Sequence, residues 1–183
     1  RKHRNIDLMK RNGILYDENM EVSISEKNAV IRKKWDIIRK IVAIAMTRLA
    51  AETYLEKREN GQKELKIITD IFEERYQFKQ VLSEREKNYL ENPSDDKELN
   101  LEFYFMLEGA KMLLWVLSII DVEFADFNTF CDVSMLIDGL KHENLKSFAR
   151  KCQIRSKNKI LDMVDYTYRL NWANVEIKLD GYE

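Results

Sequence analysis

Residues that interrupt helices are scarce in this sequence, which holds one proline and five glycines among 183 residues. Proline and glycine mark most tight turns, and an all-β fold of this length needs a turn about every 8 to 12 residues. The sequence has too few of them for so many turns. We therefore predict an all-α fold in which helices account for most of the chain.

Apolar residues at steps of three and four mark the individual helices. The heaviest apolar load falls on residues 96–120, so we expect a central apolar helix there, surrounded by the others. The other expected helices span residues 4–11, 26–58 and 62–76, a short stretch from Ser83 to just before Pro93, residues 133–140 and 143–150, and a final helix capped by Ser156. Asn12-Gly13 should end the first of these, Ser83 and Glu86 have the spacing of a capping box, and Asp132 is the expected N-cap of residues 133–140. Residues near 14–24 alternate in part, which predicts either a small β arm or a loop.

Length and composition favour one domain that covers residues 1–183. This length is close to the usual size of a domain, and 45% hydrophobic residues can supply a core. No repeat, low-complexity tract or long linker divides the sequence. The predicted architecture is a single-domain multi-helix bundle.

Charges of the two signs are nearly balanced, with 31 Lys and Arg against 32 Asp and Glu. A formal net charge of −1 does not favour a nucleic-acid-binding protein, because such proteins usually present a basic surface. The main basic cluster contains Arg32, Lys33, Lys34, Arg39 and Lys40. Helical spacing places these residues on a solvated helix face, so we do not expect nucleic acid as a partner.

Cysteine content and hydropathy indicate the cellular compartment of the protein. Cys131 and Cys152 are too few for a disulfide framework, and we expect both to be reduced thiols in a cytoplasmic protein. No apolar run reaches the roughly 18 residues that a membrane span needs, and no apolar segment follows the basic start as in a signal peptide. We therefore predict no membrane partner.

The strongest candidate for a polar site lies in the stretch RSKNKILDMVDYTYRLNWA. On a helix, Asp162, Asp165, Arg169 and Trp172 fall on one stripe, with Tyr168 beside it. Asp165 and Arg169 are spaced as a favourable i,i+4 ion pair. The apolar residues of the same helix are expected to point one way and to pack against other helices: Ile160, Leu161, Val164, Tyr168, Trp172 and Val175.

Two interpretations of these charges stay open. Arg155 precedes the stripe, and Glu108 lies on the helix that we expect to pack alongside. In the structural interpretation the charges form a partly buried network that fixes helix register. In the functional interpretation two nearby carboxylates and an arginine line a pocket, where one carboxylate could act as an acid and the other as a base. We favour the structural interpretation.

Other candidates for chemistry are weaker. His3 and His142 are the only histidines, and neither belongs to a recognisable nucleophile pair. Cys131 precedes an expected helix start, which can lower a thiol pKa, but a packing role is the commoner case. The Asp162-x-x-Asp165 spacing does not by itself define a metal site. We therefore assign no catalytic residue, metal ligand or cofactor, and leave enzymatic activity open.

Four motifs in order resemble a widespread bacterial family known only as a domain of unknown function: LSEREKNYLENP, GAKMLLWVLSIID, FCDV and RSKNKILDMVDYTYRLNWA. The positions that match are Glu108, Trp115, Cys131, Arg155, Ser156, Asp162, Asp165, Tyr168, Arg169 and Trp172. Asn158 stands where the family usually has Glu, and Asn171 where it has His. The sequence also ends at Glu183, before a further C-terminal segment that many members carry. The resemblance implies membership and no particular activity.

The leading functional prediction is a non-enzymatic protein-interaction module, such as an accessory or immunity-type protein, that binds another protein through its charged surface. The alternative is an enzyme or small-ligand binder with a pocket between helices that contains Glu108, Asp162, Asp165 and Arg169. Weak nucleic-acid binding by the basic face is the third hypothesis. The sequence predicts neither the identity of a protein partner nor the oligomeric state.

Overall fold

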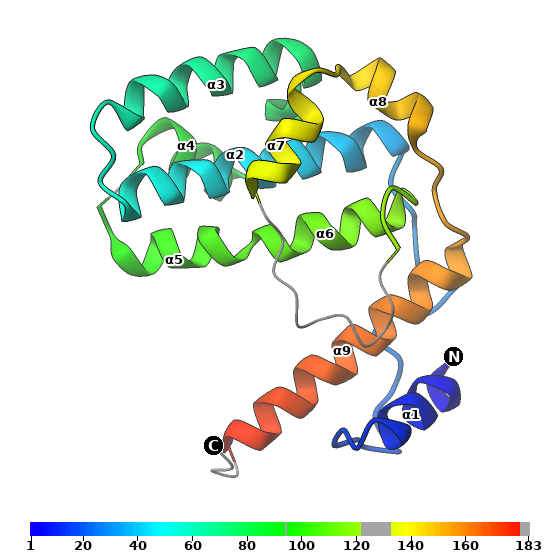
Figure 1. The fold of residues 1–183 in the computed structure, drawn as a ribbon. Coiled ribbons are helices and arrows are strands. Elements are labelled where there is room, and N and C mark those ends of the chain that lie inside the picture. Colours follow the sequence, from blue (N-terminus) through cyan, green and yellow to red (C-terminus); the bar gives the residue numbers. More distant parts are fainter. Residues whose placement is uncertain (94, 122–132, 180–183) are drawn as a thin grey trace. The chain divides into compact units, whose positions relative to one another are not determined.

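The computed structural model describes residues 1–93, 95–121 and 133–179. The chain divides into two compact units (Figure 1). The terminal unit comprises Arg1–Ile31 and Arg155–Glu183, and the inserted unit comprises Arg32–Ile154. The prediction that residues 1–183 form one domain stays a prediction.

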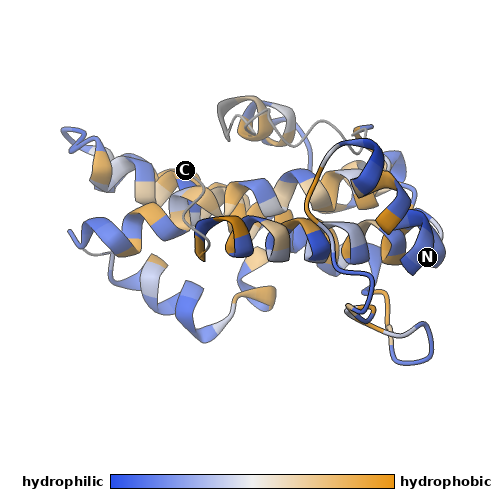
Figure 2. Cartoon of the chain, turned by 90° about the horizontal axis from the view of Figure 1, so that it is seen from below, coloured by the Kyte–Doolittle hydropathy of each residue, from blue (hydrophilic) through white to orange (hydrophobic). Residues whose placement is uncertain are grey.

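Helices account for all the regular secondary structure of the described residues, which confirms the all-α prediction. The terminal unit contains α1 (Lys2–Arg11) and α9 (Lys157–Leu179). The inserted unit contains α2 (Lys34–Leu55), α3 (Gly61–Tyr76), the 3₁₀ helix η1 (Phe78–Val81), α4 (Glu84–Glu91), α5 (Lys97–Phe105), α6 (Leu107–Val116), α7 (Val133–Lys141) and α8 (Leu145–Lys151). Hydrophilic and hydrophobic residues alternate along these helices, as expected when each has an apolar side (Figure 2).

The core of the inserted unit is organised by α2, not by residues 96–120 as the sequence predicted. α2 packs against α3, η1, α4, α5, α6, α7 and α8, and Figure 1 shows it between α3 and the α5–α6 pair. Thirteen of its 22 residues are buried. Small residues such as Ala43, Ala45 and Ala50 are fully buried, so neighbouring helices can approach α2 from several directions.

The expected helix over residues 96–120 is two helices, α5 and α6, with the break at Met106. The Met106 carbonyl accepts a hydrogen bond from the Gly109 N–H at 2.9 Å, three residues on, in a tight turn. Gly109 lowers the helix propensity of this region, and its presence could have indicated the break. Asp96 begins α5 as its N-cap, because its side chain accepts from the N–H groups of Glu98 and Leu99.

Several predicted helix ends are confirmed. Ser83 and Glu86 form the expected capping box at the start of α4, which ends at Glu91 before Pro93. α1 ends at Arg11, and Gly13 adopts a φ of 66°, a left-handed conformation that suits glycine. The expected helix over 26–58 begins later, at Lys34.

The β arm is absent from residues 14–24, all of which the structure describes, and the loop alternative is confirmed. A strand needs a partner for its backbone groups. Here the Met20 and Ile24 carbonyls instead accept from the side chains of Arg169 and Arg1, at 3.1 and 3.0 Å. The expected cap at Asp132 and the candidate Cys131 lie outside the described residues.

Candidate functional site

Most of the predicted site residues lie on α9, which begins where the sequence predicted. The Ser156 carbonyl accepts from the Ile160 N–H at 3.1 Å, and its Oγ accepts from the Lys159 N–H at 3.4 Å. Ser156 is therefore the N-cap of a 23-residue helix.

Asp165 and Arg169 form a buried ion pair. Arg169 Nε donates to Asp165 Oδ2 at 3.0 Å, and Nη2 donates to Oδ1 at 3.4 Å. Each side chain is 1% exposed. Two charges buried this completely are tolerated because each neutralises the other, and removal of either one would leave an uncompensated charge in the interior.

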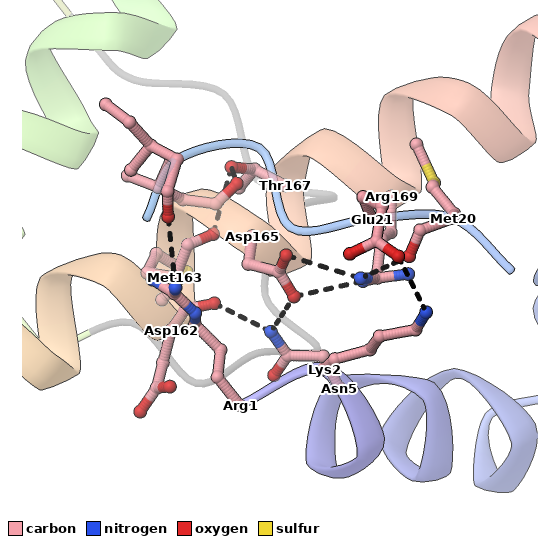
Figure 3. A network of polar contacts seen from close by, with 12 residues as sticks. Arg1, Lys2, Asn5, Met20, Glu21, Asp162, Met163, Asp165, Thr167 and Arg169 are labelled. Carbon is pink, nitrogen blue, oxygen red and sulfur yellow. Dashed lines mark hydrogen bonds and ion pairs between the residues drawn. The ribbon is translucent and has the colours of Figure 1, made fainter. Parts of the chain in front are cut away.

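Two groups outside α9 complete this network (Figure 3). Asn5 of α1 donates from Nδ2 to Asp165 Oδ2 and to the Asp162 carbonyl, both at 2.9 Å. Arg169 Nη2 donates to the Met20 carbonyl at 3.1 Å. The network therefore fastens α1 and the loop after it to α9. Nothing in the sequence pattern indicated Asn5 or Met20 as members, because both contacts depend on tertiary structure.

Asp162 takes a different position on the same helix. Its carboxylate forms an ion pair with Arg4, whose side chain is 65% exposed. A pair with one partner in solvent contributes little to stability. The two aspartates thus lie in different environments, one in the buried network and one at its edge.

One donor of the buried network has no partner among the described residues. The Nη1 atom of Arg169 is buried and makes no hydrogen bond there. A buried donor without an acceptor costs about 1–3 kcal/mol. This donor has spare capacity for a polar group.

Tyr168, Val164 and Val175 point to solvent, which corrects the prediction that they pack against other helices. Their exposed fractions are 45%, 41% and 44%. Ile160 and Leu161 of the same predicted face are buried, and Trp172 is half-buried. The side of α9 that packs inward holds the Asp165–Arg169 pair together with the buried residues Met163, Tyr166 and Ala173. Val164, Tyr168 and Val175 lie outside this side and are exposed.

The remaining candidates, Glu108 and Arg155, lie in different units of the chain. Glu108 lies in the first turn of α6, in the inserted unit, whereas Arg155 precedes α9 in the terminal unit. The predicted proximity of Glu108 to the α9 charges stays a prediction. Both side chains are half-buried.

The basic cluster near the start of α2 is largely engaged within the chain. Lys34 Nζ donates to the carbonyls of Ala149 and Cys152 at 3.1 and 2.8 Å, which caps the end of α8. Lys40 Nζ lies 2.6 Å from both carboxylate oxygens of Glu86. These side chains have structural roles, so the solvated basic face predicted from the sequence is smaller than its charge count indicates.

Other reactive groups of the described chain are poorly placed for chemistry. Cys152 is buried and donates from Sγ to the Phe148 carbonyl at 3.2 Å. Burial raises the pKa of its thiol, which disfavours the nucleophilic thiolate. In the part of the chain that the structure describes, no group of three His, Cys, Asp or Glu side chains could hold a metal ion. No described helix is long and apolar enough to cross a membrane.

These features define an all-α protein whose α9 has an inward charged network and an outward apolar face. The family model described as a domain of unknown function, DUF4272, matches residues 1–183, so the chain belongs to this family. No curated protein and no solved structure matches the chain. Membership agrees with the resemblance seen in the motifs, and it brings no activity.

Proposed function

We propose that this chain is a non-enzymatic protein-interaction module whose binding surface is the outward face of α9. We call this surface the α9 seam. It consists of Val164, Tyr168, Trp172, Val175 and Leu179. The seam, rather than the charged surface expected from the sequence, is the better candidate for contact with another protein.

The observation that carries the proposal is the exposure of large apolar side chains in one row. Tyr168 is 45% exposed and Leu179 is 75% exposed. Single exposed apolar residues are ordinary, but a contiguous apolar row is typical of an interaction site. Tyrosine and tryptophan are also the residue types that most often dominate binding energy.

The buried charged residues are already hydrogen-bonded within the chain, which supports a non-enzymatic role. Asp165 and Arg169 are hydrogen-bonded to each other and to Asn5 and Met20. A general acid or base must reach a substrate, and the Asp165 carboxylate is 1% exposed. The structural interpretation of these residues is therefore the better supported one.

Site-specific photo-cross-linking tests the proposal. A benzophenone amino acid in place of Tyr168 should give a discrete protein adduct in the native host cell. The matched control carries the same group in place of Asn158, an exposed residue of α9 outside the seam. An adduct pattern at residue 168 no different from that at 158 would argue against the seam as a binding surface.

The small-ligand alternative is favoured by one observation, the unpartnered Nη1 of Arg169. A ligand that bound there would stabilise the folded protein in proportion to its concentration. A screen of small carboxylates and neutral carbonyl compounds by thermal unfolding tests this idea. A ligand that raises Tm in the wild type and not in Arg169→Met would establish the small-ligand alternative. If the screen finds no such ligand, only the protein-interaction proposal remains.

A further inference from the structure

A cavity of about 520 Å³ lies at one end of the inserted unit. Figure 1 shows the end of α2, the start of α3 and the start of α5 at this end. The side chains that line the cavity are mostly polar or charged: Thr53, Tyr54, Lys57, Arg58, Gln62 and Asp95. Its volume falls within the range of about 300–1,000 Å³ that small-molecule sites usually have. All the lining residues belong to the inserted unit, which does not contain the α9 seam.

Two opposite charges in the lining do not neutralise each other. Lys57 and Asp95 are exposed, and neither side chain forms an ion pair with a residue that the structure describes. They line the same cavity but lie too far apart to pair with each other. Arg58 differs, because its Nε donates to Glu56 at 2.6 Å and its Nη2 donates to Glu52 at 3.1 Å. Lys57 and Asp95 therefore keep their charges available to a ligand.

Lys57 occupies a backbone position that favours glycine. It follows the end of α2 and adopts a φ of 49°, in the left-handed region. Its N–H donates to the Tyr54 carbonyl at 3.3 Å, and the Arg58 N–H donates to the Thr53 carbonyl at 3.3 Å. Helices commonly end in such a turn, with glycine at the left-handed residue because any side chain there costs energy. Strain of this kind is typical of functional positions.

Tyr54 adds a neutral polar group to the cavity. Its side chain is half-buried. Burial and the nearby Asp95 carboxylate both raise the pKa of its hydroxyl. The hydroxyl therefore stays protonated at neutral pH and keeps its hydrogen-bonding capacity. The cavity thus presents an ammonium, a carboxylate and a hydroxyl to one small volume.

We propose that this cavity binds a small zwitterion, a free α-amino acid. The ligand's carboxylate accepts from the Lys57 ammonium, and its own ammonium donates to the Asp95 carboxylate. Charge-assisted hydrogen bonds of this kind are stronger than neutral ones, and two of them fix the orientation of the ligand. A ligand with a single charge leaves the other charge of the cavity without a partner. The inference goes beyond the proposed function, because it assigns a small-molecule site to the unit without the seam.

Thermal unfolding of the full chain with each soluble α-amino acid tests the site. At least one should raise Tm with a dissociation constant on the order of 1 mM, as expected for two accessible charge contacts. Its N-acetyl derivative lacks the ammonium and its amide lacks the carboxylate, so each should bind about tenfold more weakly. No rise in Tm with any amino acid at up to about 20 mM would overturn the proposal.

Two substitutions assign the two charges. Asp95→Asn should bind the amino acid about as weakly as the wild type binds the N-acetyl derivative. Lys57→Met should bind it about as weakly as the wild type binds the amide. Asp70→Asn and Lys66→Met make the same charge changes at exposed positions of α3 outside the cavity and should leave binding unchanged. Equal effects of the cavity and control substitutions would overturn the assigned site.

Lys57→Gly separates a binding role from a structural one. Glycine adopts a left-handed conformation without steric cost, so this variant should raise the Tm of the free protein. It should also weaken binding of the amino acid about tenfold, as Lys57→Met does. A Lys57→Gly protein that keeps the wild-type affinity would overturn the role of Lys57 in binding.

Discussion

At the scale of single residues, two of the charged positions singled out by the motif, Asp165 and Arg169, form a buried ion pair. Asn5 donates to Asp165 and the Met20 carbonyl accepts from Arg169, while Nη1 of Arg169 has no partner among the described residues. The i,i+4 spacing made the pair predictable from sequence. Its burial was not predictable, because that depends on an asparagine and a backbone carbonyl that are distant in the chain.

Asp165→Asn should lower the free energy of unfolding by about 3 kcal/mol, because Arg169 would keep its charge in the interior without a counter-charge. Urea denaturation measures the change. Asp162→Asn is the matched control and should cost less than about 1 kcal/mol, since the Arg4 partner of Asp162 is mostly exposed. The double variant Asp165→Leu/Arg169→Met should recover most of the loss. Equal effects of the two asparagine substitutions would contradict the buried network.

Glu86 gives a pH-dependent contribution to stability. Burial raises the pKa of its carboxyl, but hydrogen bonds from Lys40 and Ser83 outweigh burial and hold that pKa below the ordinary value. A carboxyl with a lowered folded-state pKa contributes stability above the unfolded-state pKa, and this contribution is lost as pH falls through the folded-state pKa. The wild type should therefore exceed Glu86→Gln in unfolding free energy by about 1–3 kcal/mol at pH 6.

Urea denaturation of both proteins between pH 6 and pH 3 measures this difference. The gap between wild type and Glu86→Gln should narrow at the acid end of the series. A gap that is constant over the whole range would show that the ionised carboxylate contributes nothing, and would contradict the role given to Lys40 and Ser83.

At the scale of helices, local sequence signals predicted where a helix begins or ends better than they predicted where it lies in the fold. The Ser83–Glu86 capping box and the Gly13 turn are encoded within a few residues, and both are confirmed. The central place of α2 was missed, because apolar load alone favoured residues 96–120. The central position of α2 depends on its small buried residues, such as Ala43 and Ala50, which let other helices pack closely against it. Their effect depends on which helices surround them.

Gly61 is required by the close approach of α3 to the end of α2. A Cβ added there would lie 2.5 Å from Thr53 Cγ2 and 3.0 Å from Arg58 Cβ. Gly61→Ala should therefore destabilise the protein by about 1–3 kcal/mol. Thr53→Ser removes Cγ2 and keeps the hydroxyl that donates to the Leu49 carbonyl, so the double variant should regain much of that loss.

Gly139→Ala is the matched control for this substitution, because Gly139 lies within α7 with no atom within 4 Å of an added Cβ. It should stabilise the protein by up to about 1 kcal/mol through higher helix propensity. Thermal unfolding of the four variants measures all these differences. A failure of Thr53→Ser to improve Gly61→Ala would contradict the steric explanation.

At the scale of the whole molecule, the central claim is that α9 presents its charged network inward and its apolar seam outward. The sequence-based prediction placed Val164, Tyr168 and Val175 inward, and this was wrong. The most direct test compares unfolding free energies of Tyr168→Glu and Asp165→Asn by urea denaturation, at a concentration where the protein is monomeric. We expect Tyr168→Glu to lower the unfolding free energy by less than about 0.5 kcal/mol, as most surface substitutions do. Asp165→Asn should lower it by about 3 kcal/mol. A larger loss for Tyr168→Glu than for Asp165→Asn would contradict this orientation of α9.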